Sequence, residues 1–304
     1  MQKPFFVYGS LKPTELAFLQ VNRFVIKSEP AKLPGYKLFV RDLLAIAFKD
    51  AKDSEILGSV LHLNDTGIDF LRIASNYEGK NYELTQAEVI LEDDSVISAN
   101  LFVGLYPGLG SPIPVGKSWS VVNDSLLADS FPTLMRTVQA TLPDNFEQFE
   151  AKNSAWESKN RRFGNFLLLT AILEHIYTLC FGGIVENPNQ AKRALRELDS
   201  FKKSFQMAKR ANLIPEISVN DYRSPDAPPK NTSSSRNALD AWTAIRNNML
   251  HRGKSGSDTE MMEDATIGLS NTLYYFLSSE LPHLKRYWDE NYPDLAPIKR
   301  SYKS

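Results

Sequence analysis

The sequence is poor in cysteine and carries almost no net charge. Its 304 residues contain a single cysteine, Cys180, so neither an intramolecular disulfide nor a cysteine-based metal site is possible. A lone thiol is typical of a reducing interior, and we expect a cytoplasmic location. The formal net charge is −1, which argues against a globally basic nucleic-acid binder. Any contact with RNA must therefore come from a local cleft.

Long hydrophobic runs are missing as well. The N-terminus, MQKPFFVYGS, has no charged region followed by a long apolar stretch, so it does not resemble a signal peptide. The longest apolar run, residues 166–180, is interrupted by Glu174 and His175. We therefore expect no membrane span. Nothing in the sequence indicates a metal or another cofactor.

The chain length predicts two domains, and the texture of the sequence changes near residue 125. Short apolar segments and turns fill the first part, and helical spacing of apolar residues follows. The predicted class is α+β, with a mixed N-terminal domain and an all-helical C-terminal domain. We expect domains at 1–125 and 154–290, a connecting helix and linker at 126–153, and a tail at 291–304.

Alternating apolar residues predict strands at 5–8, 58–63, 86–91 and 97–105. The last two form a predicted hairpin, because Asp93-Asp94-Ser95 between them is typical of a turn. Asp65-Thr66 is expected to cap a helix that runs to about Ser75. Helices are expected at 125–141, 155–181, 188–211, 234–252 and 258–287. Four prolines predict an irregular loop at 212–233.

Two short motifs in the N-terminal part carry chemistry. Val7-Tyr8-Gly9-Ser10-Leu11 is a strand that ends at a glycine, and the backbone N–H groups of such a turn can hold a carboxylate or phosphate. The same five-residue motif also fits an ordinary strand-to-loop turn. Tyr77-Glu78-Gly79, followed by Tyr82, places a glutamate among aromatic residues. Desolvation there would make Glu78 a general base near neutral pH, although a solvated glutamate at a helix end fits the pattern too.

In this order, these motifs resemble the γ-glutamylcyclotransferase-like (AIG2-like) family over about the first 110 residues. Leu33-Pro34-Gly35-Tyr36-Lys37-Leu38 and Ile56-Leu57-Gly58-Ser59-Val60 resemble two further stretches of that family. The resemblance implies a small β-barrel with flanking helices and a cavity at the glycine loop. It implies that the loop binds a substrate carboxylate through backbone N–H groups, with Tyr82 in the binding site. Glu78 would move the proton while the substrate α-amine attacks the γ-carbonyl and releases 5-oxoproline. The implied substrate-binding residues are Tyr8, Gly9, Ser10, Leu11 and Tyr82.

The chain departs from this family at two positions. Ser75 stands where members often carry an acidic residue, three positions before the glutamate. Tyr82-Glu83-Leu84 replaces the Tyr-x-Arg of many members. The missing arginine leaves the choice of substrate open.

The helical part contains a second motif, Arg246-Asn247-x3-His251 followed by Arg252-Gly253. On a helix, an apolar stripe of Ala238, Trp242, Ile245 and Met249 forms one face. Asn247 and His251 lie roughly opposite, and Arg246 lies on the flank. An ordinary polar surface is the alternative interpretation.

This motif resembles the signature of the HEPN family, whose members are metal-independent ribonucleases or nucleotide-binding modules. In HEPN dimers two motif helices face each other, so the resemblance implies a homodimer with RNA as partner. His251 would activate the 2′-hydroxyl, Arg246 would stabilise the phosphoryl charge, and Asn247 would orient either group. Leu239, Thr243 and Leu250 are then candidate dimer contacts. Glu174-His175 and the basic residues between 202 and 210 are further candidates for the cleft, although each also fits a solvated helix face.

Three hypotheses follow. The first is a HEPN-type ribonuclease whose N-terminal domain binds or modifies a small γ-glutamyl-like ligand. The second is a γ-glutamyl-amine or γ-glutamyl-peptide cyclotransferase whose helical domain serves for dimerisation. The third is a non-enzymatic binding or regulatory protein. The predicted catalytic residues are Glu78, Arg246, Asn247 and His251.

Overall fold

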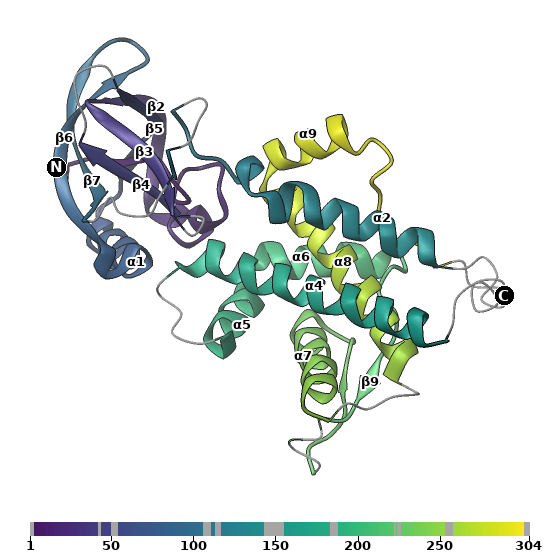
Figure 1. Ribbon diagram of the computed structural model, residues 1–304. Coiled ribbons are helices and arrows are strands. Elements are labelled where there is room, and N and C mark those ends of the chain that lie inside the picture. The colour runs from purple at the N-terminus through teal and green to yellow at the C-terminus, as the bar shows by residue number, and fades with distance from the viewer. Residues whose placement is uncertain are drawn as a thin grey trace. The chain divides into compact units, whose positions relative to one another are not determined.

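The computed structural model divides the chain into two compact units (Figure 1). The barrel unit comprises Met1–Asp124 and Ile176–Pro188, and the helical unit comprises Ser125–His175 and Asn189–Ser304. Each is described by itself. The structure describes residues 3–41, 44–49, 54–105, 111–112, 117–142, 155–182, 188–221, 223, 226–252 and 258–300.

Five strands of the barrel unit form a closed barrel in the order β1-β5-β2-β6-β7. β1 runs antiparallel to β5 and parallel to β7, and the β1–β7 pairing of Phe5 with Asn100 closes the sheet. The expected barrel is therefore confirmed. The strands are β1 (Phe5–Val7), β2 (Val25–Pro34), β5 (Glu55–Leu63), β6 (Tyr82–Leu91) and β7 (Val96–Gly104).

A second sheet, in the order β4-β3-β8, belongs to the same unit. Its strands are β3 (Tyr36–Arg41), β4 (Leu44–Lys49) and β8 (Ser111–Pro112). The barrel core is aromatic: the ring of Phe5 packs at 5.1 Å from that of Phe70 and 5.4 Å from that of Phe102. These contacts join the first strand to α1 (Gly67–Glu78) and to β7. The floor of the barrel is thereby fixed by side chains far apart in the sequence.

Helix α1 is one turn longer than the sequence analysis expected. Its first turn is organised by Asn64, whose side-chain oxygen accepts hydrogen bonds from the Thr66 backbone N–H at 3.0 Å and from the Thr66 hydroxyl at 2.6 Å. Thr66 is the N-cap residue, as expected, but its side chain makes no cap hydrogen bond to the helix. The helix ends at Glu78 because Gly79 adopts φ of 69°, a left-handed conformation that favours glycine. Four short 3-10 turns complete the unit: η1 (Leu16–Gln20), η2 (Asn22–Phe24), η3 (Gly79–Asn81) and η4 (Val121–Asn123).

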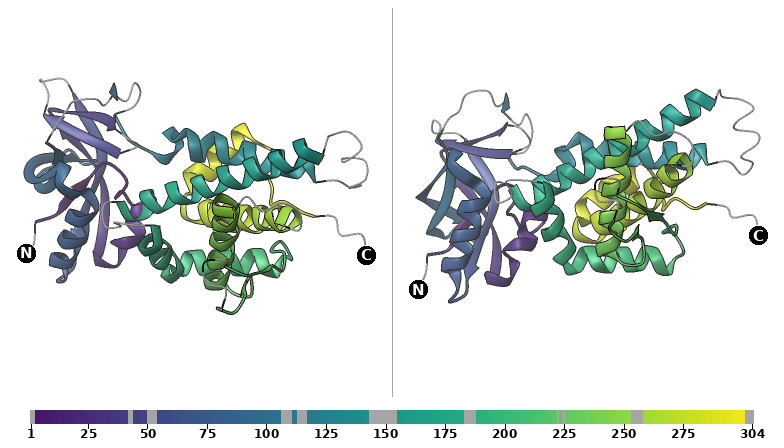
Figure 2. Two further views of the ribbon diagram at one scale, coloured as in Figure 1. Left: turned by 60° about the horizontal axis from the view of Figure 1, so that its bottom comes forward. Right: turned by 90° about the horizontal axis from the view of Figure 1, so that it is seen from below.

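The helical unit is built around α8 (Asp258–Glu280), which is buried along most of its length (Figure 2). α6 (Asp199–Arg210) packs against it through Phe201 and Phe276, whose ring centroids lie 5.7 Å apart. Trp288 of α9 (Pro282–Asn291) donates its indole N–H to the carbonyls of Leu127 and Ala128, both at 3.2 Å. Those carbonyls belong to a π-helical turn, η5 (Leu126–Ser130), that leads into α2. The remaining elements are α2 (Phe131–Thr141), α4 (Ala155–Phe181), α5 (Pro188–Glu197), α7 (Ser235–Arg252), β9 (Ser218–Val219) and β10 (Lys230–Asn231).

Two of the expected helices are each divided in the structure. The single helix predicted for 188–211 is wrong, because Leu198, with ψ of 120°, separates α5 from α6. The helix predicted for 258–287 is wrong too. It ends at Glu280, and Pro282 begins α9 because proline has no N–H to continue a preceding helix. The helix expected at 155–181 is confirmed as α4. The expected linker falls almost wholly outside the described residues.

The predicted loop 212–233 contains a short β9–β10 ladder and a buried carboxylate. Asp221 accepts hydrogen bonds from Arg223 Nη2 at 3.0 Å and from Lys230 Nζ at 2.8 Å. The Arg223 guanidinium and the Lys230 ammonium hold the pKa of Asp221 well below its usual range. This ion-pair cluster gives the described part of the loop a defined structure.

One stretch of α4, Asn160–Phe181, is long and apolar enough to cross a membrane by length and composition alone. In this fold, however, 56% of its most apolar window is buried against the rest of the chain. The core helix of a globular unit has the same character, so the stretch is weak grounds for a span.

The close crossing of β1 and β5 yields a prediction about stability. A Cβ atom on Gly58 would lie 2.3 Å from the carbonyl oxygen of Val7 and 2.6 Å from the ring of Phe6. Gly58→Ala should therefore lower the free energy of unfolding by about 2–3 kcal/mol through overpacking. Calorimetric unfolding of the full chain would measure it.

The matched control is Gly164→Ala in α4, where an added Cβ meets nothing within 4 Å. That change should be neutral or slightly stabilising, because alanine favours helix over glycine. Equal effects of the two substitutions would contradict the described crossing.

Candidate active site

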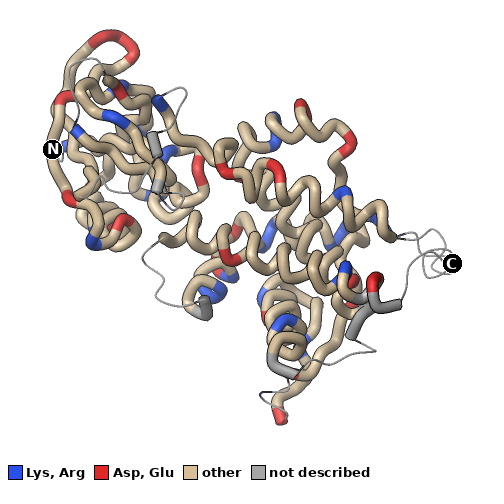
Figure 3. Tube along the Cα trace, in the orientation of Figure 1, with Lys and Arg blue, Asp and Glu red and all other residues tan. Residues whose placement is uncertain are grey.

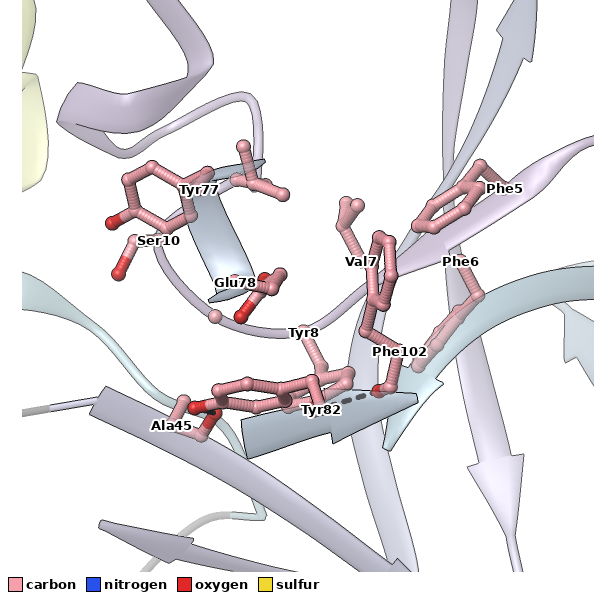
Figure 4. Close-up of a pocket in the computed structure, with 12 residues that line it drawn as sticks. Phe5, Phe6, Val7, Tyr8, Ser10, Ala45, Tyr77, Glu78, Tyr82 and Phe102 are labelled. Atoms are coloured by element: carbon pink, nitrogen blue, oxygen red, sulfur yellow. Dashed lines mark hydrogen bonds between the residues drawn. The ribbon is translucent and has the colours of Figure 1, made fainter. Parts of the chain in front are cut away.

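A small cavity lies beside the barrel end of β1, where the glycine loop meets the last turn of α1 (Figure 4). Its volume of about 20 Å³ is enough for roughly one water molecule. Half of the described residues that line it are aromatic, and Glu78 is the one acidic side chain among them. It is lined by Phe5, Phe6, Val7, Tyr8, Gly9, Ser10, Leu11, Ala45, Tyr77, Glu78, Tyr82 and Phe102.

The glycine loop packs tightly and leaves backbone donors without partners. A Cβ on Gly9 would lie 3.0 Å from the Cβ of Ala45, so glycine allows the loop to pass close to β4. Ser10 and Leu11 are only 6% and 3% exposed. Among the described residues, nothing accepts a hydrogen bond from the backbone N–H of either one. Because buried N–H groups are nearly always paired, two such donors beside a cavity indicate a place for a bound acceptor.

Lys12 fastens the end of this loop. Its buried ammonium donates to the carbonyl of Trp119, and to Ser118 Oγ at 3.1 Å. Burial lowers the pKa of Lys12, and nearby Glu15 opposes that effect. Glu15 in turn accepts a hydrogen bond from the Val121 N–H at 3.3 Å. The sequence analysis missed both residues, because neither belongs to a periodic pattern or to a recognised motif.

Two tyrosines of the cavity use their hydroxyl groups to hold the surrounding backbone. Tyr8 donates to the carbonyl of Phe102 at 2.8 Å and accepts from the N–H of Ala47 at 3.2 Å. Tyr82 donates to the carbonyl of Ala45 at 3.2 Å. Burial, followed by the charge of Glu78, raises the pKa of Tyr8 well above its usual value, so its phenol stays neutral. The predicted binding residues are thus brought together, and both phenols already have backbone partners.

Glu78 is the last residue of α1, and its carboxyl lies in the cavity, facing Tyr8 and Tyr82 (Figure 4). No hydrogen bond joins this carboxyl to another described residue. Burial therefore acts without compensation and raises the pKa of Glu78 from 4.5 to about 8. Such a group can take up and release a proton near neutral pH.

The second predicted constellation is only partly described. Arg246 lies on α7 and pairs with Glu174 of α4, with 2.8 Å between Nη1 and Oε1. Asn247 is half-buried. The side chain of His251 lies outside the described residues. The structure thus brings Arg246 and Glu174 together, and it does not test whether His251 joins them.

The core face predicted for α7 is confirmed, and one predicted dimer contact is wrong. Ala238, Trp242, Ile245 and Met249 are all buried. Leu239 is also completely buried, and Thr243 Oγ1 donates to its carbonyl at 2.6 Å. Leu239 therefore packs inside its own unit, and it cannot form a contact with a second copy. Leu250 is 48% exposed.

Two of the basic residues predicted to meet RNA, Lys202 and Lys209, have partners within the helical unit, where acidic and basic residues are interspersed (Figure 3). Lys202 pairs with Glu197 and Asp199, both at 3.5 Å. Lys209 donates to the carbonyl of Ser233 at 2.6 Å. These pairs favour the alternative of a solvated, charge-balanced helix face.

Comparison with known proteins identifies the N-terminal part. Residues 5–121 match the family described as "Gamma-glutamyl cyclotransferase, AIG2-like". The match covers the barrel and the cavity and ends before the helices of the second unit. No curated protein matches the chain. Nothing in the comparisons supports the HEPN resemblance.

Solved structures with a similar N-terminal part have low identity to this chain. One described as a gamma-glutamyl cyclotransferase is 17% identical, covers 37% of this chain and 72% of its own, and has a TM-score of 0.29. A protein from Arabidopsis thaliana is 19% identical, with coverages of 44% and 91% and a TM-score of 0.31. An AIG2-like protein from Mus musculus is 13% identical, with coverages of 39% and 88% and a TM-score of 0.33. Assignment of the domain rests on the family match.

The raised pKa of Glu78 predicts a pH dependence of stability. The unfolded chain ionises this carboxyl near pH 4.5, whereas the folded chain retains its proton until about pH 8. The folded state therefore binds more protons between these values, and the stabilising contribution present below pH 4.5 is lost as pH rises to 8.

Glu78→Gln should remove this component, so that the variant gains stability over wild type as pH rises through the window. Denaturant unfolding from pH 4 to 9 would measure the difference. A constant difference between the two proteins at every pH would show that Glu78 titrates normally.

Proposed function

We propose that this chain, whose residues 5–121 form an AIG2-like γ-glutamyl cyclotransferase domain, converts γ-glutamyl amides into 5-oxoproline and a free amine. The observation that carries the proposal is the position of Glu78. Its carboxyl lies in a cavity beside the backbone N–H groups of Ser10 and Leu11, and none of the three groups has a hydrogen-bond partner among the described residues. A proton carrier and an anion site therefore lie side by side, which this reaction requires.

The loop supplies the binding part of the mechanism. The N–H groups of Ser10 and Leu11 would donate to the α-carboxylate of the substrate. Hydrogen bonds from two donors to a charged acceptor are stronger in a place shielded from water than in bulk solvent. Lys12, which holds the loop to Trp119, would keep these donors in place.

Glu78 supplies the proton transfers. As a carboxylate it removes a proton from the substrate α-amine while the amine nitrogen attacks the γ-carbonyl carbon. The new carbon–nitrogen bond closes the five-membered ring, and the original amide bond breaks. Glu78 then gives the proton to the departing amine nitrogen, so no water is consumed. A pKa of about 8 suits both steps, because the group gives and takes the proton with little penalty near neutral pH.

The leaving group stays open. The family often carries an arginine at the position of Leu84, and here that residue is an exposed leucine with 48% of its surface accessible. The exposed carboxylate of Glu83 beside it cannot replace a cation. We therefore propose a γ-glutamyl donor without specifying the amine. A cavity that holds about one water must widen to admit such a group.

The proposal predicts release of 5-oxoproline from at least one member of a panel of γ-glutamyl amines and γ-glutamyl peptides. Glu78→Gln should lower kcat/KM by about 10²–10⁴-fold, because a positioned general base contributes that much. The acid limb of the pH profile of kcat/KM should titrate near pH 8. Quantifying 5-oxoproline by mass spectrometry would measure both.

Glu83→Gln is the matched control, since Glu83 is an exposed glutamate of the same segment, and it should retain wild-type activity. If wild type releases 5-oxoproline from none of the substrates in the panel, the proposal is wrong and a binding role for the domain is favoured.

The ribonuclease hypothesis stays a prediction, as do its RNA partner and its homodimer. No observation favours it over the cyclotransferase, because Arg246 is engaged by Glu174 and the family match ends at residue 121. It predicts RNA cleavage with 2′,3′-cyclic phosphate ends that His251→Ala abolishes. Cleavage that survives this substitution would end it.

A further inference from the structure

The barrel unit includes a short segment from much later in the chain. Residues Ile176–Pro188 group with Met1–Asp124, although the family match ends at residue 121. The described part of this segment is the end of α4 and the glycine that follows it. Ile176, Leu179 and Cys180 are each at most 2% exposed. These three side chains are therefore buried in the folded chain.

Tyr77 is the residue that this segment touches, and it directly precedes Glu78. Its hydroxyl donates to the carbonyl of Leu179 at 3.1 Å, and the side chain is only 5% exposed. Leu179 lies in the last turn of α4, where backbone carbonyls have no partner within the helix. The Ser10 side chain lies near the same hydroxyl and partly opposes the burial that raises the pKa of Tyr77. One phenol thus joins the glycine loop, the end of α1 and the end of α4.

Gly182 makes the second contact with Tyr77. It has φ of 51°, a left-handed conformation that commonly ends a helix at glycine. A Cβ atom at this position would lie 2.7 Å from two ring atoms of Tyr77 and 2.9 Å from its carbonyl oxygen. Both the backbone conformation and the space therefore require glycine here. Gly182 therefore packs directly on Tyr77, the residue that precedes Glu78 in the chain.

We propose that residues 176–182 are a positioning element for the active site, holding Tyr77 through Leu179 and Gly182 so that Glu78 and Ser10 face the same cavity. The effect of this element on catalysis rests on the proposed function. Its effect on the position of Glu78 does not. Neither Leu179 nor Gly182 lines the cavity. They act through Tyr77, which does.

The pKa of Glu78 distinguishes a positioning role from a general loss of stability, because a loss of stability alone would not change it. The titratable side chains near it are the phenols of Tyr8, Tyr77 and Tyr82, which are all buried. Desolvation is the cause of the raised pKa of Glu78, and no described cation contributes to it. Displacement of Tyr77 would admit water to the carboxyl, and the pKa of Glu78 would then fall toward 4.5.

The test compares Gly182→Ala and Tyr77→Phe with wild type and with Gly164→Ala, a control at a glycine inside α4 where an added Cβ meets nothing within 4 Å. Carbon-13 NMR of glutamate carboxyls in the full chain, assigned with Glu78→Gln, would give the pKa of Glu78 in each protein. The kinetics of 5-oxoproline release would be measured alongside. We expect Gly182→Ala to lower this pKa by at least about one unit and kcat by at least about tenfold.

Tyr77→Phe keeps the ring and removes only the hydroxyl, so it tests the bridge if Gly182→Ala does not fold. We expect a KM several times higher, because the Ser10 side chain loses its polar neighbour, together with a smaller fall in the pKa of Glu78. Gly164→Ala should match wild type in every measurement.

The proposed reaction and the positioning role of residues 176–182 can be contradicted independently of each other. If wild type releases no 5-oxoproline while the pKa of Glu78 still falls in Gly182→Ala, the proposed reaction is wrong and the positioning role stands. If a folded Gly182→Ala, or in its absence a folded Tyr77→Phe, shows the same Glu78 titration as Gly164→Ala, the positioning role is overturned.

Discussion

The carboxyl of Glu78, buried without a hydrogen-bond partner, is the feature on which the site depends. A carboxyl turned to solvent at the end of a helix would ionise near pH 4.5 and would move protons poorly at neutral pH. Here α1 stops at Gly79 and leaves its last side chain in an aromatic cavity. Strands of the barrel supply part of the walls, and the phenols of Tyr8 and Tyr82 are hydrogen-bonded to the surrounding backbone. The proton transfers of the proposed mechanism depend on the raised pKa that this burial produces.

Much of the site could be predicted from the sequence because its parts are local. The glycine loop and the glutamate–glycine pair are short motifs, each with a direct physical reason for its residues. The family resemblance that rests on them predicted the barrel and the cavity, and the role of Glu78 as a base stays a prediction. Lys12 and Glu15 could not be found in this way. Their roles come from contacts with residues more than a hundred positions away, and no pattern near them signals those contacts.

The limits of prediction for the fold have similar causes. β2 was missed because only two of its ten residues are buried and it contains two prolines, so the alternation typical of a half-buried strand is absent. The long charged helix of 188–211 was expected to be continuous because nothing in its sequence marks the break at Leu198. The break after Glu280 had a signal, the proline at 282, which should have carried more weight. For α7 the apolar stripe was predicted correctly, since helical periodicity determines which face is buried.

The helical unit shows how a motif can be placed correctly without its function being supported. Arg246 and Asn247 lie near the end of a helix, outside the core stripe, as the pattern required. The guanidinium is paired with Glu174 of another helix in the same unit, which is how an ordinary structural arginine behaves. The barrel unit differs because Glu78 has no such partner among the described residues, and a buried polar group of this kind is expected to bind a ligand.

The most direct measurement is the NMR spectrum of the isotope-labelled protein during titration with 5-oxoproline, the product that should occupy the cavity. The account predicts that the amide signals of Ser10 and Leu11 move downfield as they donate to its carboxylate, and that the carboxyl signal of Glu78 moves with them. Signals that change only elsewhere, or no change at saturating product, would contradict the assignment of this cavity as the active site.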